Sequence, residues 1–302
     1  MRCLSLSVIP MGRLDELREA ARRQLEAGGI AAARESVGIL LAAALGRDRA
    51  FLHAHPEYHL NPGELARFAE YMDRRLRGEP AQYILGRQEF YGRDFEVTPA
   101  VLIPRPETEL LVTAALEKAA VPRRSSAPLR IVDAGAGSGC IAVTLALELA
   151  ARGQTADIFA TDISPAALAV AENNARRWRA AVAFQSGDWL EAWRGQAGQF
   201  DLIVSNPPYI PESELPGLQR EVREFEPRVA LAAGETGLEC YARLLPAALR
   251  LLVPGGWLLL EMGYRSAEGV RGWFADWAEV ETRCDLQGWP RVLLAQKKTA
   301  GP

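Results

Sequence analysis

Cysteine and histidine are scarce in this 302-residue chain, which contains four of the former and three of the latter. The cysteines lie far apart and form no Cys-x-x-Cys pair, so neither a zinc ribbon nor a thioredoxin-like redox site is expected. Scattered free thiols suit a reducing compartment, which favours the cytoplasm. The histidines cluster at His53, His55 and His59 around Pro56, a pattern that favours a turn between helices over a metal site.

A basic excess and a long apolar run are also missing. Lysine and arginine total 35 against 38 aspartates and glutamates, which gives a net charge of −3. The first 85 residues carry 12 basic and 11 acidic side chains, and the remainder carries 23 and 27. Proteins held to duplex nucleic acid mainly by phosphate contacts usually carry a basic excess, so no stable nucleic-acid partner is expected. The apolar stretches are short or interrupted, and no membrane-spanning segment is expected.

The first part of the chain has the pattern of a helical domain. Apolar residues recur at helical spacing at Leu14, Leu17, Ala21 and Leu25. Further along, Asn61–Glu64 reads Asn-Pro-Gly-Glu, which is typical of a helix start with asparagine as the cap and proline at the first helical position. We therefore expect residues 1–85 to form a small all-α domain.

The pattern then changes twice. Residues 88–103 alternate aromatic and β-branched side chains around Gly92, which predicts a β-hairpin, and we assign residues 86–106 to a hairpin linker. From residue 107 to 302, expected strands alternate with helices and end in an antiparallel strand. This alternation predicts an α/β domain with a Rossmann-like, mostly parallel sheet covered by helices. Ligands of such sheets bind at the carboxyl ends of the strands.

A glycine-rich turn follows the first expected strand of this domain. The turn consists of Gly135, Ala136, Gly137, Ser138 and Gly139. Its glycines alternate, whereas a dinucleotide-binding turn has the spacing Gly-x-Gly-x-x-Gly, and no Lys-Ser/Thr pair of a P-loop follows. The acidic Asp133 just before it disfavours phosphate and suits a cationic ligand.

Two further strand ends complete the pattern of a nucleoside site. Asp162 ends the second strand, where a carboxylate is placed to accept hydrogen bonds from both ribose hydroxyls. Asp188 and Trp189 follow the third strand, where they can meet the edge and face of an adenine, although a turn with a packed tryptophan would look the same. A nucleoside without pyrophosphate is expected, and S-adenosylmethionine fits best.

The fourth strand, Phe200–Ser205, leads into Asn206, Pro207, Pro208 and Tyr209. Two prolines make this corner rigid. The side-chain oxygen of Asn206 and the carbonyl of Pro207 then offer two acceptors for the two donors of one planar NH₂ group. Such contacts position a poorly nucleophilic amide or adenine nitrogen and stabilise the positive charge that develops on it. The ring of Tyr209 offers a face for stacking on a flat amide or base.

Together these residues resemble class I S-adenosylmethionine-dependent methyltransferases, and among them the protein-(glutamine-N5) methyltransferases that act on peptide chain release factors, the HemK/PrmC type. The resemblance covers nearly the whole chain. The segments that carry it are residues 77–84, 90–92, 102–109, 135–139, 162–165, 187–189, 205–210 and 225–228.

The resemblance implies methyl transfer to the glutamine side chain in the Gly-Gly-Gln motif of class I release factors, in support of translation termination. It implies a monomeric cytoplasmic enzyme whose helical domain helps to dock the release factor. Cofactor contacts would fall on the glycine-rich turn, Asp162, Trp189 and Asn206, and no metal is implied. Substrate-amide contacts would fall on Asn206, Pro207, Pro208 and Tyr209, with Asn206, Pro207 and Tyr209 as the catalytic set.

The sequence leaves open the roles of two residues and the choice between three functions. Within the characteristic segment 102–109, Arg105 and Glu107 fit equally well as an edge of the cofactor site or as anchors of the linker. The same Asn-Pro-Pro-Tyr corner would also serve an adenine-N6 methyltransferase of DNA or RNA, although the acidic balance of the second part disfavours it. A binding module without activity is the remaining alternative, and the presence of Asp162 and Asn206 disfavours it.

Overall fold

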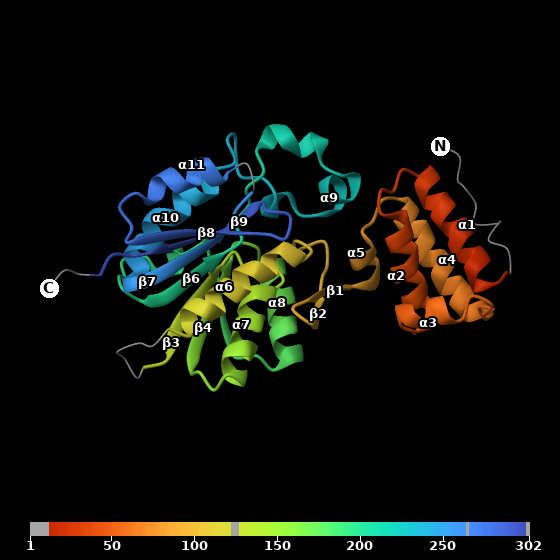
Figure 1. The fold of residues 1–302 in the computed structure, drawn as a ribbon, viewed down its shortest axis with the longest axis horizontal. Coiled ribbons are helices and arrows are strands. Elements are labelled where there is room, and N and C mark those ends of the chain that lie inside the picture. Colours follow the sequence, from red (N-terminus) through yellow and green to blue (C-terminus); the bar gives the residue numbers. More distant parts are fainter. Residues whose placement is uncertain (1–11, 122–126, 264–265, 300–302) are drawn as a thin grey trace. The chain divides into compact units, whose positions relative to one another are not determined.

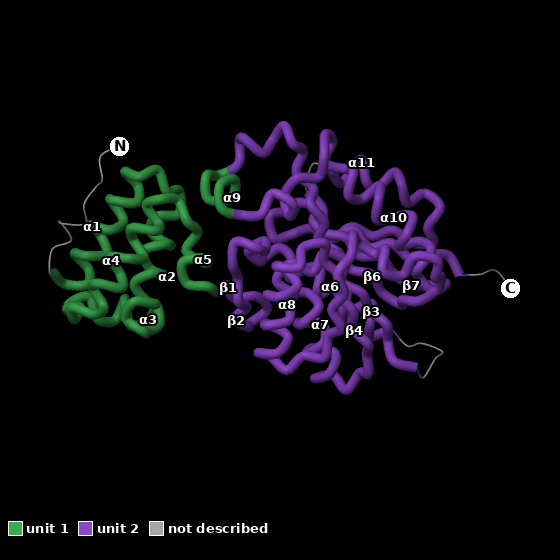
Figure 2. The backbone as a smooth tube through the Cα atoms, turned by 180° about the vertical axis from the view of Figure 1, so that it is seen from behind, with its two compact units in different colours: residues 1–86, 219–225 green, residues 87–218, 226–302 purple. Residues whose placement is uncertain are grey.

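The computed structural model describes residues 12–121, 127–263 and 266–299. The chain divides into two compact units, one formed by residues up to 86 together with 219–225 and the other by the rest (Figure 2). No helix within the described ranges is long and apolar enough to cross a membrane. Cys3 lies outside these ranges, and the other three cysteines are free thiols.

The described part of the first unit is helical. Its helices are α1 (Leu14–Ala27), α2 (Ala33–Leu45), α3 (Arg49–Ala54), α4 (Pro62–Leu76), α5 (Ala81–Leu85) and α9 (Arg220–Phe225). Helix α1 buries its predicted apolar stripe. Helix α2 packs against α1, α3, α4 and α5, which explains why its apolar residues are not confined to one stripe. Within this unit, the buried guanidinium of Arg75 on α4 pairs with Glu221 on α9.

The start of α4 is capped as its sequence predicts. Asn61 Oδ1 accepts a hydrogen bond from the backbone N–H of Glu64 (2.9 Å), and Glu64 Oε2 accepts one from the backbone N–H of Asn61 (2.8 Å). This reciprocal capping box satisfies donors that the first turn of a helix leaves without partners. The Glu64 side chain also accepts from the hydroxyl of Tyr58 (3.1 Å).

The second unit contains a hairpin and a seven-stranded sheet, which confirms the predicted fold class (Figure 1). The strands of the sheet, in spatial order, are β5 (Val182–Ser186), β4 (Ala156–Asp162), β3 (Leu129–Ala134), β6 (Phe200–Ser205), β7 (Leu252–Glu261), β9 (Pro290–Gln296) and β8 (Glu279–Cys284). The first five of these are mutually parallel, and β9 is antiparallel to both β7 and β8.

Helices cover both faces of this sheet. Successive residues of a strand point to opposite faces, so each strand contributes apolar side chains to a core on either side. The helices of this unit are α6 (Glu109–Ala119), α7 (Cys140–Ala151), α8 (Pro165–Trp178), α10 (Glu239–Leu251) and α11 (Ala267–Arg271). Ile131 and Leu202 pack with residues of α6 and α7 in one core, and Val132 and Ile203 pack with residues of α10 and α11 in the other. The two buried faces explain why β3, β6 and β7 are nearly continuous apolar runs.

The hairpin strands are β1 (Arg87–Phe90) and β2 (Arg93–Glu96), joined through Tyr91 and Gly92, which both have positive φ (53° and 74°). The buried side chain of Asn174 on α8 accepts from the backbone N–H of Glu96 (2.7 Å) and donates to its carbonyl (3.0 Å). The hairpin is thus bonded to the sheet domain, whereas the sequence interpretation set residues 86–106 apart as a linker.

We expect Asn61→Ala to lower the free energy of unfolding by about 1 kcal/mol, because α4 loses its N-cap acceptor and Glu64 loses its reciprocal partner. Chemical denaturation followed by circular dichroism measures this loss. Asn61→Ser keeps a capping oxygen and is the matched control, with a stability close to that of the unchanged chain. Equal stabilities of the alanine and serine variants would show that the cap contributes nothing measurable.

Candidate active site

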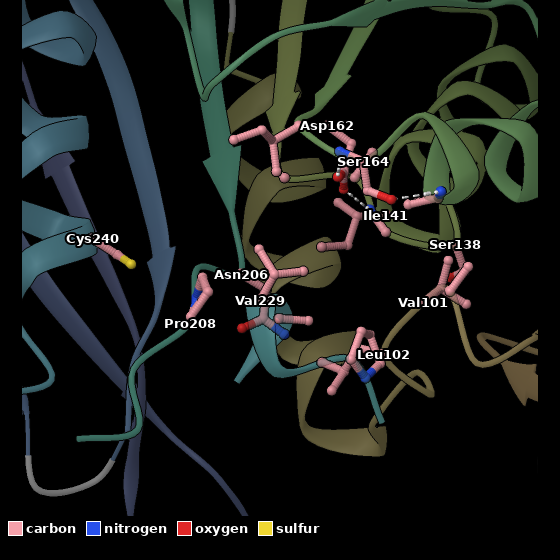
Figure 3. A pocket seen from close by; sticks show the side chains of 18 of the residues that line it. Val101, Leu102, Ser138, Ile141, Asp162, Ser164, Asn206, Pro208, Val229 and Cys240 are labelled. Carbon is pink, nitrogen blue, oxygen red and sulfur yellow. Dashed lines mark hydrogen bonds between the residues drawn. The ribbon is translucent and has the colours of Figure 1, made fainter. Parts of the chain in front are cut away.

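A cavity of about 230 Å³ lies in the second unit at the carboxyl ends of β3, β4 and β6. The strand order reverses there, because β3 is followed by β4 and β5 on one side and by β6 and β7 on the other. Open parallel sheets bind ligands at such a point. Figure 3 shows Asp162 with Ser164 and Asn206 with Pro208 as two groups around this cavity.

Most of the residues that the sequence singles out meet here. The predicted residues in the cavity wall are Gly135, Ala136, Gly137, Ser138, Asp162, Trp189, Asn206 and Pro208. Gly139, Pro207 and Tyr209 are not part of the wall. The structure therefore brings the glycine-rich turn and the Asn-Pro-Pro corner to one cavity, as expected from the ends of neighbouring parallel strands.

The glycines of the turn are required for two different reasons. Gly135, Gly137 and Gly139 all have positive φ (84°, 53° and 77°), which strains any residue with a Cβ. A Cβ on Gly139 would also lie 3.0 Å from the Cβ of Ala171 on α8. Gly139 thus allows α7 and α8 to pack closely, Gly135 allows the ring of Trp189 to approach, and Gly137 leaves its backbone open.

Asp162, at the end of β4, is held rigidly beside this turn. Its Oδ2 accepts from the backbone N–H of Gly137 (2.8 Å), and its Oδ1 accepts from the backbone N–H of Ser164 (2.8 Å). Both oxygens retain further lone pairs, so the fixed carboxylate can still accept hydrogen bonds from a ligand in the cavity. Ser164 in turn caps α8 by accepting from the N–H of Ala167 (3.2 Å).

Trp189 and Asp188 form the wall beyond β5. Trp189 has a positive φ of 52°, which is unusual for a side chain of this size. The hydroxyl of Thr161 donates to its carbonyl (2.7 Å), and its ring lies close to Gly135, where a Cβ would come within 3.3 Å of it. Asp188 pairs with Arg243 of α10, and both belong to the wall.

Asn206 follows directly on β6, and its side chain is oriented by one hydrogen bond. Its Nδ2 donates to the hydroxyl of Thr108 (3.3 Å). Within the described residues, no hydrogen bond is accepted by Asn206 Oδ1 or by the carbonyl oxygen of Pro207. Both acceptors of the corner are therefore without a donor in the described residues, and of these two residues only Asn206 belongs to the cavity wall.

Tyr209 is packed away from the cavity wall. Its ring lies against Gly263, where a Cβ would come within 2.9 Å of Tyr209 Cδ2. Burial raises the pKa of the Tyr209 phenol above its ordinary value, with the carboxyl of Glu261 adding to the effect. The phenol is therefore neutral at physiological pH and has no role as an anionic base.

The sequence left two roles open for Arg105, an edge of the cofactor site and an anchor of the linker, and its contacts fit both. Arg105 is part of the cavity wall, and its guanidinium pairs with the buried carboxylate of Glu226 (2.5 Å). Glu226 also accepts from the backbone N–H of Ile103 (3.3 Å). Glu107 is not in the cavity wall.

Two carboxyl groups near the site are almost fully buried. Burial raises the pKa of Asp133 to about 7, although the backbone N–H of Ala142 at the start of α7 donates to it (3.2 Å). Burial likewise raises the pKa of Glu261, at the end of β7, to about 7, while a hydrogen bond from Thr108 (2.6 Å) opposes the shift. The sequence pointed to Asp133 but not to Thr108 or Glu261. The position of Thr108 in the characteristic segment 102–109 is the one sequence signal for this pair.

The donor set fits a cationic nucleoside cofactor. The open backbone of the glycine-rich turn, the fixed carboxylate of Asp162 and the apolar surfaces of Ile141 and Ile163 line one cavity. Oδ1 of Asp133, buried behind the turn, has no hydrogen-bond partner in the described residues. In the described ranges, no group of three or more histidine, cysteine, aspartate or glutamate side chains has the arrangement of a metal site.

Two family models match the sequence of this chain. Residues 16–86 match the family model described as the PrmC N-terminal domain, and residues 108–217 match the Methyltransferase small domain. In solved structures, the hMettl16 catalytic domain is 17% identical and superposes with a TM-score of 0.51, covering 74% of this chain and 84% of that chain. At this identity the likeness shows the fold alone.

The curated relatives are much closer in sequence. The release factor glutamine methyltransferase of Koribacter versatilis is 47% identical, over 95% of this chain and 99% of the relative. That of Nitratidesulfovibrio vulgaris is 44% identical over 96% and 97%, and that of Geobacter sulfurreducens is 46% identical over 90% and 92%. The chain therefore belongs to the release factor glutamine methyltransferase family.

Proposed function

We propose that this chain transfers a methyl group from S-adenosylmethionine to the side-chain amide nitrogen of glutamine in the Gly-Gly-Gln motif of class I peptide chain release factors. The observation that carries the proposal is the free acceptor pair of the corner. Asn206 Oδ1 and the Pro207 carbonyl have no hydrogen-bond donor in the described residues, and Asn206 lines the same cavity as Asp162. Curated relatives named for this reaction match nearly the whole chain.

The residues of the wall would hold the cofactor as follows. The carboxylate of Asp162 would accept hydrogen bonds from the ribose hydroxyls, the glycine-rich turn would contact the amino-acid portion, and Trp189 would pack on the adenine. When bound, S-adenosylmethionine supplies an electrophilic methyl group on a sulfonium centre. The carboxylate of Asp162 in the cavity wall favours a ligand with positive charge.

The corner would act on the glutamine amide by positioning and by electrostatics. Asn206 Oδ1 and the Pro207 carbonyl accept the two N–H groups of the substrate amide, which orients the nitrogen lone pair toward the methyl group. The same fixed dipoles stabilise the positive charge that grows on nitrogen, which then loses one of its protons to give the neutral methylated amide. Pro208 forms the adjoining wall, and Tyr209 supports the corner as a neutral side chain.

The helical unit would contribute to binding of the release factor. The cavity of the second unit accounts for one cofactor and one side-chain amide, whereas selection of a protein substrate needs additional surface. The match of residues 16–86 to a domain found in this family supports this assignment.

Incubation of the full chain with purified release factor and methyl-labelled cofactor tests the proposal. We expect label in the release factor and none in the variant factor whose motif glutamine is replaced by alanine. A parallel incubation with DNA and RNA separates the alternative reaction on adenine. Label in nucleic acid, or equal label in both release factors, would refute the proposal.

We expect Asn206→Ala to lower turnover by about 100-fold or more, because one of the two acceptors for the reacting amide is lost. Cofactor affinity, measured by calorimetry, is expected to change much less. Asn173→Ala on the exposed side of α8 is the control for asparagine removal and is expected to leave turnover unchanged. Full turnover in the Asn206 variant would remove the assigned role.

We expect Asp162→Asn to weaken cofactor binding by about tenfold or more, because an amide replaces one acceptor oxygen and the negative charge. The measurement is calorimetric titration with S-adenosylmethionine. Asp157→Asn, exposed on the same strand, is the control and is expected to bind normally. Unchanged affinity in the Asp162 variant would place the ribose elsewhere.

A further inference from the structure

Two polar residues behind Asn206 are not used by the mechanism above. Thr108 closes the 3₁₀ turn Pro106–Thr108 just before α6, and Glu261 is the last residue of β7. Each is only 2% exposed, and Thr108, unlike Glu261, is also part of the cavity wall. They come from the characteristic segment 102–109 and from a strand end for which the sequence suggested no chemistry.

The hydrogen bonds among these residues form a chain with one direction. A threonine hydroxyl has a single proton to donate and lone pairs to accept. Thr108 Oγ1 lies 2.6 Å from Glu261 Oε2 and 3.3 Å from Asn206 Nδ2. With its proton donated to the carboxylate, the hydroxyl can only accept from Asn206.

This direction decides which end of the Asn206 amide meets the ligand. The amide has nearly the same shape after a half-turn, so shape alone does not separate its oxygen from its nitrogen. Because the Thr108 hydroxyl accepts, the Nδ2 end faces the interior, and Oδ1 is left without a donor in the described residues. A reversed amide would present N–H groups to a substrate NH₂ and repel it.

A buried carboxyl is a costly way to fill the interior. Removal of a carboxylate from water is unfavourable unless hydrogen bonds compensate it, and apolar residues of similar volume often give equal or greater stability. The hydrogen bond from Thr108 to Glu261 is short, at 2.6 Å, and an ionised Glu261 can only accept, which fixes the direction of the threonine proton. The arrangement therefore has a use in orientation that packing alone does not explain.

We propose that Thr108 and Glu261 are positioning residues of the methyl-transfer site: Glu261 fixes the proton of the Thr108 hydroxyl, and the hydroxyl fixes the Asn206 amide with Oδ1 toward the reacting nitrogen. The inference rests on the proposed function and adds to it Thr108, which is part of the cavity wall, and Glu261, which is not. It also gives a purpose to the segment 102–109 that its sequence pattern left undefined.

The first experiment compares three variants of the full chain in the labelled-methyl assay. We expect Thr108→Val to lower kcat by about tenfold or more, with KM for the release factor and cofactor affinity within about threefold of the unchanged chain. Thr108→Ser restores the hydroxyl and is expected to keep kcat within about threefold. Thr144→Val on α7 is the matched control, since its buried hydroxyl has no partner in the described residues, and it is expected to leave kcat unchanged.

A double-mutant cycle tests whether Glu261 acts through Thr108. Glu261→Gln keeps the volume but offers an N–H₂ that can donate to Thr108 and release its proton toward Asn206, so we expect a lower kcat. In the double variant with Thr108→Val, the second change is expected to add less than about twofold. In Thr108→Val alone, the buried carboxylate of Glu261 loses its hydrogen-bond donor, which destabilises the fold. The double variant contains no such charge.

The outcomes separate this inference from the proposed function. If the unchanged chain does not methylate the release factor, the proposed function fails. If it does, and Thr108→Val is as active as Thr108→Ser, or the two losses multiply in the double variant, the positioning role is refuted. Normal cofactor binding by calorimetry identifies the variants that are folded, and the double variant decides the question if Thr108→Val alone is not.

Discussion

The parallel pairing of β3 with β6 is the constraint on which the site depends. In this register Ile131, Val132 and Asp133 lie opposite Leu202, Ile203 and Val204, so the two strands end at the same edge. The hydroxyl of Ser205 donates to the carbonyl of Ala134 (2.6 Å) and links the two strand ends. A slip of one residue would turn the apolar side chains to the wrong faces and would separate the glycine-rich turn from Asn206.

Hydrogen bonds at the strand ends and two prolines make the surroundings of the cavity rigid. Asp162 accepts from two backbone N–H groups, Trp189 is held in a left-handed conformation by Thr161, and two prolines fix the chain after Asn206. Each of these arrangements costs conformational freedom or strain that the packed sheet must offset. Their concentration at one cavity is the expected signature of a site that is organised before its ligand arrives.

Local signals account for the parts that could be predicted from the sequence. The cap at Asn61 and the bounds of β6 follow from residues close together in the chain, and the structure has them as expected. The turn at Gly135–Gly139 was recognisable because its alternating glycines permit positive φ. The structure adds a second reason for Gly139, which is the close approach of Ala171 on α8.

The sequence by itself determined the helical first part, the α/β class of the second and the residues that end strands at the binding edge, because periodicity, caps and turn chemistry are local. Only the tertiary structure decided which carboxyl groups are buried and how Asn206 is oriented. Glu261 and Thr108 lie 153 positions apart and meet only because β7 and the start of α6 pack together. A hydrogen bond of that kind leaves no periodic trace in the chain, since its partners are selected by the packing of the sheet.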